Sequence, residues 1–377
     1  MNSFDAPATF ATTPDGFPEV PLPLMAAGGQ AAPAGVVTPA TAPAEFVPAE
    51  PSTLDQAGLT PIDIESLVLK LLHISGPTVG RRIAEQVRLP FGLVAEQLRS
   101  LKAQLLVNYS NQAAMGDFEY ELTEEGGKRA QWHLGRCTYC GAAPVPLEDY
   151  IASIRRQSIR NMRPKLPDLC AAFADLLLPP ASLSQIGQAV YAGRGLFLYG
   201  QPGNGKTSIA ERVIRAMSQN IWIPRTITVT GEIIRVFDPA NHEEAPLTSP
   251  QGQLLDVLHY DRRWVRIRRP SIVVGGELKL EHLEITNNPI TGILESPVQL
   301  KSNGGALVVD DFGRQRCSTE ELLNRWIVPL EKGHDFLSLP SGRQIEVPFD
   351  QLLIFSTNLE PHRLVDEAFL RRIPYKI

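Results

Sequence analysis

A short run of glycines near the middle of the chain ends in lysine and threonine. Its members are Gly200, Gln201, Pro202, Gly203, Asn204, Gly205, Lys206, Thr207 and Ser208. Glycines at this spacing let consecutive backbone N–H groups turn toward an anion, the lysine ammonium reaches phosphate oxygens, and the threonine hydroxyl binds a magnesium ion. The run therefore predicts a phosphate-binding loop (P-loop) for ATP and Mg²⁺, with Thr207 as a metal ligand. The alternative is a glycine turn that binds no ligand.

The residues on either side of this loop support the same prediction. Residues 195–199 are apolar and bounded by glycine, and residues 208–214 have the apolar spacing of an amphipathic helix. A strand, a glycine loop and a helix in this order direct the positive end of the helix dipole toward a bound phosphate.

A second apolar run, residues 305–309, ends in the paired acids Asp310 and Asp311. An unbroken apolar run suits a buried strand of a parallel sheet, and ligands bind at the carboxyl edge of such sheets. Nucleotide hydrolysis needs one carboxylate near the metal ion and one near the attacking water. We therefore assign Asp310 to the metal and Asp311 to the water; the alternative is a simple turn.

Two more segments complete an ordered set. Residues 352–357 are apolar and are followed by Asn358, and residues 366–373 predict a short helix that carries Arg371 and Arg372. The P-loop, the paired aspartates, this strand and this helix, in this order, resemble the AAA+ family of ATPases. The resemblance implies that Asn358 contacts the γ-phosphate or its attacking water, and that Arg371 or Arg372 reaches the nucleotide of a neighbouring subunit. A helix-capping asparagine and a solvated basic helix end are the alternatives.

The resemblance covers residues 166–377 and implies an α/β fold, the doubly wound parallel sheet of P-loop NTPases. It also implies ATP hydrolysis at subunit interfaces in a homo-oligomeric ring, commonly a hexamer. The interval between the P-loop and the aspartates is longer than such a core needs, which predicts a β-rich insertion around residues 230–300. Its basic run, residues 262–269, either faces a ring pore and grips a polymer or packs on its own domain.

A hairpin is predicted between Asp335 and Val347, with its turn at residues 341–342. Together with the glycine-containing turn at residues 302–305, it resembles the pre-sensor-hairpin branch of AAA+ proteins, which includes MoxR-like chaperone ATPases. The chain departs from the family pattern in two ways. Most AAA+ proteins have glutamate where this chain has Asp311. The helical lid that usually follows the arginine helix is not found after it, so either the sequence is a fragment or the lid is absent.

Three further segments are predicted ahead of residue 166. Residues 1–55 are rich in Ala and Pro and predict a disordered tail, residues 56–135 resemble a winged-helix domain, and residues 136–165 predict a linker. The third predicted helix of the winged-helix-like part offers side chains that suit DNA: Gln97, Arg99, Lys102 and Gln104. The alternative is a domain that packs on protein.

Cys137 and Cys140 form half of a zinc-binding pattern, with His133 close in sequence and no second pair following. A structural zinc ion needs four ligands. A metal site and a reduced surface turn therefore both stay open at this point.

The composition limits partners and location. The 377 residues carry a net charge of −5, which argues against binding of nucleic acid through the overall charge of the protein. No apolar stretch is long enough to span a membrane, and the first basic residue is Lys70, so no secretory or organelle signal is expected. We expect a cytoplasmic protein.

These features predict an ATP-hydrolysing AAA+ protein that remodels a protein client as a ring oligomer. The alternative is a DNA-binding motor or transcription regulator that uses residues 56–135. A third alternative is a nucleotide-binding switch without sustained hydrolysis, because of Asp311 and the missing lid.

Overall fold

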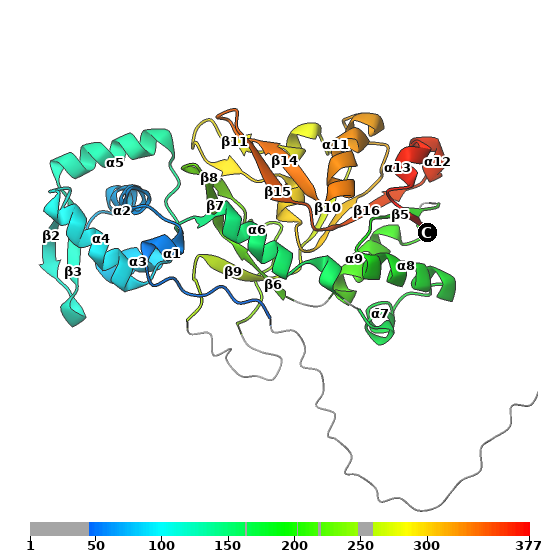
Figure 1. Ribbon diagram of the computed structural model, residues 1–377, viewed down its shortest axis with the longest axis horizontal. Coiled ribbons are helices and arrows are strands. Elements are labelled where there is room, and N and C mark those ends of the chain that lie inside the picture. Colours follow the sequence, from blue (N-terminus) through cyan, green and yellow to red (C-terminus); the bar gives the residue numbers. More distant parts are fainter. Residues whose placement is uncertain (1–44, 163, 202, 218–219, 248–258) are drawn as a thin grey trace, which may run out of the picture. The chain divides into compact units, whose positions relative to one another are not determined.

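The computed structural model describes residues 45–377 except residues 163, 202, 218–219 and 248–258 (Figure 1). Residues Glu45–Ile377 form one compact unit. Most of the predicted tail, residues 1–44, lies outside the described residues, and so does Pro202 of the P-loop. None of the helices in the described part is long and apolar enough to cross a lipid bilayer.

A five-stranded parallel sheet carries the segments that the sequence assigns to chemistry. Its strand order is β10-β13-β16-β5-β17. The strands are β5 (Leu196–Tyr199), β10 (Ser271–Val274), β13 (Ala306–Val309), β16 (Leu352–Thr357) and β17 (Tyr375–Lys376). One row across the sheet joins Val273, Val308, Ile354, Leu196 and Tyr375. The predicted α/β class is confirmed, and parallel strands place their carboxyl ends at one edge.

Helices cover both faces of this sheet (Figure 1). One face packs against α7 (Leu166–Ala172), α8 (Pro180–Ala192) and α9 (Lys206–Ala216), and the other packs against α11 (Thr319–Lys332), α12 (Pro361–Leu364) and α13 (Glu367–Leu370). Within β5, Leu196 and Leu198 face the first group, whereas Phe197 faces the second. A strand buried on both sides needs apolar residues at every position, which is why β13 and the first four residues of β16 are apolar throughout.

A second five-stranded sheet has the order β11-β12-β8-β7-β4. Its strands are β4 (Val145–Pro146), β7 (Thr226–Val229), β8 (Glu232–Arg235), β11 (Thr286–Asn287) and β12 (Leu294–Glu295). The neighbouring elements are β6 (Asn220–Pro224), β9 (Trp264–Arg268), η3 (Leu280–Leu283), α10 (Val298–Lys301), β14 (His334–Ser338) and β15 (Gln344–Pro348). The antiparallel β14–β15 pair confirms the hairpin predicted between Asp335 and Val347.

Two helices lie within residues 136–165, the segment predicted as a linker: α6 (Leu147–Arg156) and a short 3-10 helix, η2 (Ile159–Asn161). Acidic side chains in the first turn of α6 and basic side chains in its last turn complement the helix dipole. The segment expected to be a linker thus contains β4 and α6.

Part of the predicted insertion belongs to the central sheet. Strand β10 lies inside residues 230–300, and it pairs in parallel with β13, which carries the aspartates. Local sequence patterns do not reveal this pairing, because β10 follows strands that belong to the second sheet and to the β6–β9 pair.

The basic run at residues 262–269 contains β9, and three of its arginines are buried. Arg263, Arg266 and Arg269 are only 2%, 6% and 8% exposed. Arg263 binds Asp261 and two backbone carbonyls, and Arg266 pairs with Glu45. A pore-facing role is therefore wrong for these three side chains, because a buried guanidinium stays with the partners that offset its desolvation. These side chains pack within the chain, and Arg263 and Arg266 do so on residues outside the predicted ATPase core, namely Ala57, Pro144 and Glu45.

The N-terminal part contains a three-stranded antiparallel sheet with the order β1-β3-β2. Its elements are α1 (Leu54–Ala57), α2 (Pro61–Ser75), β1 (Thr78–Val79), α3 (Gly80–Val87), α4 (Phe91–Ala103), β2 (Val107–Gln112), η1 (Ala114–Gly116), β3 (Phe118–Leu122) and α5 (Glu124–Arg136). Thr78 and Val79 pair with β3, and α3 begins directly after them at Gly80.

The predicted tail also ends earlier than residue 55. Glu45 pairs with Arg266, Phe46 packs edge-on against Trp264, and Ala49 forms an isolated bridge with Tyr260. These partners are more than 200 residues away in the sequence, so local composition could not reveal them.

Candidate nucleotide site

Three of the predicted motifs leave the parallel sheet at one edge. The P-loop follows β5, the aspartates follow β13, and Asn358 follows β16. Strand β16 lies between β5 and β13 in the sheet. Asn358 therefore leaves the sheet between the P-loop and Asp310, at the edge where open parallel sheets bind their ligands.

The P-loop glycines adopt backbone conformations that side chains disfavour. Gly200, Gly203 and Gly205 have φ angles of 146°, 88° and 71°. A Cβ atom placed on Gly203 or Gly205 would meet no atom within 4 Å, so the requirement for glycine at these two positions is conformational rather than steric. Gly205 caps α9, an 11-residue helix whose first N–H groups are free to bind an anion.

Lys206 joins the P-loop to the end of β16. Its Nζ atom donates to the carbonyl oxygens of Gly200 and Gln201 at 2.9 and 3.1 Å, and to Oδ1 of Asn358 at 2.8 Å. An ammonium group has three hydrogen-bond donors, and all three are used here. Lys206 and Asn358 are far apart in the sequence, and both are predicted to contact the γ-phosphate. The structure brings their side chains into direct contact.

Thr207 and Asp310 form a second contact beside the first. The Thr207 hydroxyl lies 3.2 Å from Oδ2 of Asp310. A hydroxyl and a carboxylate are oxygen donors that suit Mg²⁺, which keeps several water molecules and takes few protein ligands beside a bound phosphate. This pair fits that ion without a larger ligand cluster. No group of three or more His, Cys, Asp or Glu side chains suited to a metal is found among the described residues.

Asp311 lies in a strained backbone conformation. Its φ angle of 47° places it in the left-handed region, which residues with a side chain seldom adopt. The Gln315 side chain supports this turn: its Nε2 atom donates to the carbonyls of Asp310 and Asp311 at 2.9 and 3.3 Å, and its Oε1 atom accepts from the backbone of Gly313. The Asp311 side chain is exposed at the sheet edge. Sequence reasoning missed Gln315, because an isolated glutamine in a turn carries no motif.

The tips of β13 and β16 are also joined directly. The backbone N–H of Phe312 donates to the carbonyl of Ser356 at 2.7 Å, and the Thr357 hydroxyl donates to the carbonyl of Phe312 at 3.0 Å. The sequence pattern assigns no role to Thr357, which comes directly before Asn358. These two hydrogen bonds fix the position of the turn at Asp311 relative to the end of β16, where Asn358 follows.

The two predicted arginines lie at the other edge of the sheet. They precede β17, whose first residue, Tyr375, is opposite Leu196 at the start of β5. Arg371 is 80% exposed and lies 3.8 Å from Glu367, whereas Nε of Arg372 donates to Glu331 at 2.8 Å. The P-loop leaves β5 at its carboxyl end, so the structure does not bring these arginines to the P-loop of their own chain.

The remaining P-loop residues make few contacts. Gln201 and Asn204 are exposed, and Ser208 lies in the first turn of α9, where its carbonyl accepts from Arg212. Residues of the first helical turn contribute backbone N–H groups to an anion site, so the position of Ser208 suits the role predicted for it.

The residues predicted for DNA binding lie on α4 and at its end. Arg99 and Gln104 are exposed, and Gln97 is partly exposed. The Lys102 ammonium lies 3.2 Å from the centre of the Tyr109 ring in β2, which is a cation–π contact. Of these side chains, Arg99 and Gln104 are the most open to a partner.

Cys137 and Cys140 lie near a buried lysine. Lys70 is 1% exposed, and its ammonium donates to the carbonyl of Cys137 at 3.3 Å. Burial lowers the pKa of Lys70 and of His133, and burial raises the pKa of the Cys140 thiol. His133 lies 3.5 Å from Glu65. The side chains of the described residues thus give the two thiols no set of further metal ligands.

Comparisons with known proteins identify no family. No protein-family model matches this chain, and none of the curated proteins matches it. Among solved structures, AbfR bound to DNA is 22% identical over 21% of this chain and 57% of AbfR, with a TM-score of 0.18. A putative DNA-binding protein from Ralstonia eutropha is 30% identical over 20% of this chain and 96% of its own length, with a TM-score of 0.18. NtrX from Brucella abortus is 14% identical over 54% of this chain and 36% of NtrX, with a TM-score of 0.32.

Proposed function

We propose that this chain binds and hydrolyses ATP as a protein of the AAA+ kind, on the doubly wound parallel sheet of P-loop NTPases. One observation carries the proposal: Lys206 contacts Asn358 while the adjacent Thr207 contacts Asp310. Residues from three different strands, each assigned to the same ligand by its sequence pattern, therefore meet at one point. A glycine turn that binds no ligand would have no need to contact the residues at the ends of β13 and β16.

In the proposed mechanism, backbone N–H groups of residues 203–208 bind the phosphates of ATP. Lys206 exchanges its bond to Asn358 for oxygens of the β- and γ-phosphates. Thr207 and Asp310 hold Mg²⁺, which neutralises phosphate charge when it is bound. Asp311 accepts a proton from the attacking water, and the freed amide of Asn358 orients that water.

The first test is ATP binding in the presence of Mg²⁺, measured by calorimetry. Replacing Lys206 with Ala removes a charged donor and is expected to weaken ATP binding by roughly 10- to 100-fold. Lys332→Ala is the matched control, because Lys332 is an exposed lysine at the end of α11. Equal ATP affinity of the Lys206→Ala variant and the natural chain would remove the proposed site.

The second part of the proposal is a homo-oligomeric ring, commonly a hexamer, that acts on a protein client in the cytoplasm. Its support is the position of Arg371 and Arg372, which lie at the sheet edge opposite the P-loop. Each chain can then offer an arginine to the nucleotide of the next chain only if copies pack head to tail, and such packing forms a ring when the rotation between copies closes. The net charge of −5 favours a protein client over bulk nucleic acid.

The alternative function is DNA binding by a winged-helix domain at residues 56–135. The observation that favours it is the exposed pair Arg99 and Gln104 at the carboxyl half of α4, beside the β2–β3 hairpin. Fluorescence anisotropy of a labelled duplex, titrated with the full chain at two salt concentrations, tests it. DNA binding predicts weaker binding at higher salt and after Arg99→Ala, but not after Lys332→Ala. No binding at low salt would remove this alternative.

A further inference from the structure

A cavity of about 490 Å³ lies where the N-terminal helices meet the second sheet. Residues of α2 and α5 form one wall, and residues of the β7–β8 turn, β11 and β12 form the other. Small-molecule sites usually have volumes of roughly 300–1,000 Å³, and this cavity falls within that range. None of the residues predicted for nucleotide binding lines it. A ligand here would therefore be distinct from the nucleotide.

A buried ammonium group lines this cavity. Lys70 is 1% exposed, and its Nζ atom donates to one acceptor in the described part of the chain, the carbonyl oxygen of Cys137, at 3.3 Å. An ammonium has three donors, and this one forms no ion pair with a carboxylate of the described residues. Burial raises the pKa of the nearby Cys140 thiol, which keeps that group neutral. Because a buried charge is costly without a partner, Lys70 favours an anion as the ligand.

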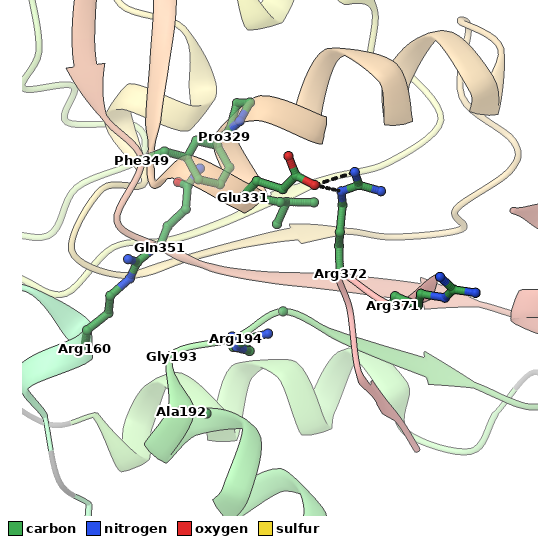
Figure 2. A pocket seen from close by; sticks show the side chains of 12 residues that line it. Arg160, Ala192, Gly193, Arg194, Pro329, Glu331, Phe349, Gln351, Arg371 and Arg372 are labelled. Atoms are coloured by element: carbon green, nitrogen blue, oxygen red, sulfur yellow. Dashed lines mark hydrogen bonds and ion pairs between the residues drawn. The ribbon is translucent and has the colours of Figure 1, made fainter. Parts of the chain in front are cut away.

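Figure 2 shows how a charged side chain is held at the wall of a different cavity, one of about 600 Å³. There, Nε of Arg372 donates to Glu331 at 2.8 Å, and dashed lines mark the pair. That guanidinium has its counter-charge within the protein, which distinguishes it from Lys70.

Two carboxylates also line the cavity beside Lys70, but each is hydrogen-bonded to a neighbour of its own. Oδ2 of Asp63 accepts from the backbone N–H of Thr60 at 2.8 Å, and Oε2 of Glu232 accepts from the Ser341 hydroxyl at 3.1 Å. Both residues are partly exposed, so solvent weakens their repulsion of an anion bound at the buried ammonium.

A second buried polar group lies close to the first. His133 lines the cavity and is 8% exposed, and its Nε2 atom is buried without a hydrogen-bond partner among the described residues. Oε1 of Glu65 lies 3.5 Å from it without the geometry of a hydrogen bond, and accepts from Arg129 instead. The carbonyl that Lys70 binds belongs to Cys137, which follows His133 by one helical turn. Lys70 and His133 together offer donors for the two oxygens of a carboxylate.

An exposed tryptophan supplies an aromatic wall beside these donors. Trp132 is 57% exposed, whereas the other tryptophans of the chain are at most 5% exposed. Its ring meets the ring of His133 edge to face, with 4.9 Å between the centroids, and the Arg136 guanidinium lies 4.9 Å from its centre. Leu67 and Leu294 extend the apolar lining. Because aromatic rings pack favourably on one another, this wall suits a ligand with an aromatic body.

We propose that this cavity binds a small aromatic carboxylate, with the acid group at Lys70 and His133 and the ring against Trp132. The proposal is independent of the proposed ATPase function, because no residue of the nucleotide site takes part. The bound acid contacts the N-terminal helices on one side and the second sheet on the other. It therefore stabilises the folded chain in proportion to its affinity.

Calorimetry with two probes of nearly the same shape tests the acid group: phenylacetate and its neutral amide, phenylacetamide. The natural chain is expected to bind phenylacetate roughly 10- to 100-fold more tightly, because hydrogen bonds to charged groups are the stronger ones. Lys70→Met removes the ammonium and keeps an unbranched side chain, so this preference is expected to disappear. Lys128→Met is the matched control, because Lys128 is an exposed lysine on α5, and it is expected to keep the preference.

Trp132→Ala tests the aromatic wall. The side chain is exposed, so this variant is expected to fold, and it is expected to bind both probes roughly 3- to 10-fold more weakly. Competition with inorganic phosphate tests the ligand class. Phenylacetate is expected to stay bound at an equal concentration of phosphate, because phosphate has no aromatic body.

Four results would overturn the proposal. They are equal affinities of the natural chain for the two probes, no binding of either probe, displacement of phenylacetate by an equal concentration of phosphate, and unchanged binding in Trp132→Ala. A preference for phenylacetate that a folded Lys70→Met variant retains would also overturn it. Melting curves show whether each variant is folded, and the tests on the natural chain and on Trp132→Ala decide the question without Lys70→Met.

Discussion

At the scale of single residues, the conformation of Asp311 is a sign of function. A non-glycine residue with a φ angle of 47° costs free energy, and such strain persists where the surroundings enforce it. Gln315 supplies that support through the carbonyls of Asp310 and Asp311. The strained turn lies at the carboxyl end of β13, the sheet edge that also carries the contact between Lys206 and Asn358.

Replacing Asp311 with Asn tests its role as the base. The amide keeps the size of the side chain but cannot accept the proton, so we expect ATP to bind normally and turnover to fall by roughly 100- to 10,000-fold. Calorimetry and phosphate release measure the two quantities separately. Asp55→Asn, which changes an exposed aspartate on α1 outside the site, serves as the control. Turnover within twofold of the natural rate in Asp311→Asn would exclude a catalytic role for this carboxylate.

Gly205→Ala tests the conformational demand of the P-loop. The φ angle of Gly205 is 71°, and a Cβ there would meet no atom within 4 Å, so the substitution adds backbone strain of about 1–2 kcal/mol without a clash. We expect a lower melting temperature that added ATP and Mg²⁺ raises less than in the natural chain. Gly127→Ala, within α5, has the same open surroundings without a positive φ. A loss of stability as large in Gly127→Ala would contradict this explanation.

At the scale of elements, local patterns predicted the strands that carry the site. Strands β5, β13 and β16 are buried on both faces, so their apolar runs are visible in the sequence and polar residues mark their ends. Patterns failed where a partner lies far away in the chain. The place of β10 beside β13 depends on a pairing, and the burial of Arg266 depends on Glu45.

Two aspartates allow an element-scale prediction about acid stability. Burial raises the pKa of Asp238, but hydrogen bonds from Lys301 and Asn241 and from the backbone of Ala240 outweigh it and lower the pKa to about 2. The folded pKa lies below the ordinary value of 3.8, so the stabilisation is complete above about pH 4 and disappears as the pH falls through 2. Asp238→Asn is expected to cost about 2 kcal/mol of unfolding free energy at pH 7 and little near pH 2.

Asp175 is the matched control for this prediction. Its hydrogen bond with Arg212 also lowers its pKa to about 2, but its side chain is 57% exposed, whereas that of Asp238 is 23% exposed. Solvent screens exposed ion pairs, so Asp175→Asn is expected to cost less stability than Asp238→Asn. Urea unfolding of both variants at several pH values measures this difference. An equal loss in the two variants would show that burial of the pair is not the cause.

At the scale of the whole molecule, the two edges of the parallel sheet have complementary chemistry. One edge carries the P-loop and its carboxylates, and the other carries the segment with Arg371 and Arg372. In the proposed assembly a head-to-tail contact would use both edges of every chain, and such contacts form a ring when the rotation closes and a filament when it does not.

This arrangement predicts that ATP promotes assembly. With ATP and Mg²⁺, Asp311→Asn retains nucleotide at the interfaces and is expected to elute as an assembly of several chains in light-scattering chromatography. Lys206→Ala under the same conditions is expected to stay at the smaller size that the natural chain shows without nucleotide. An elution profile of Asp311→Asn that ATP does not change would contradict nucleotide-bridged subunits.

The central claim is that the P-loop edge hydrolyses ATP. Steady-state release of phosphate from ATP with Mg²⁺, compared between the natural chain and Lys206→Ala, tests it most directly. The contacts of Lys206 with Asn358 and of Thr207 with Asp310 predict turnover by the natural chain and a rate at least roughly 100-fold lower in the variant. Equal phosphate release by the two proteins, or none by either, would contradict the account.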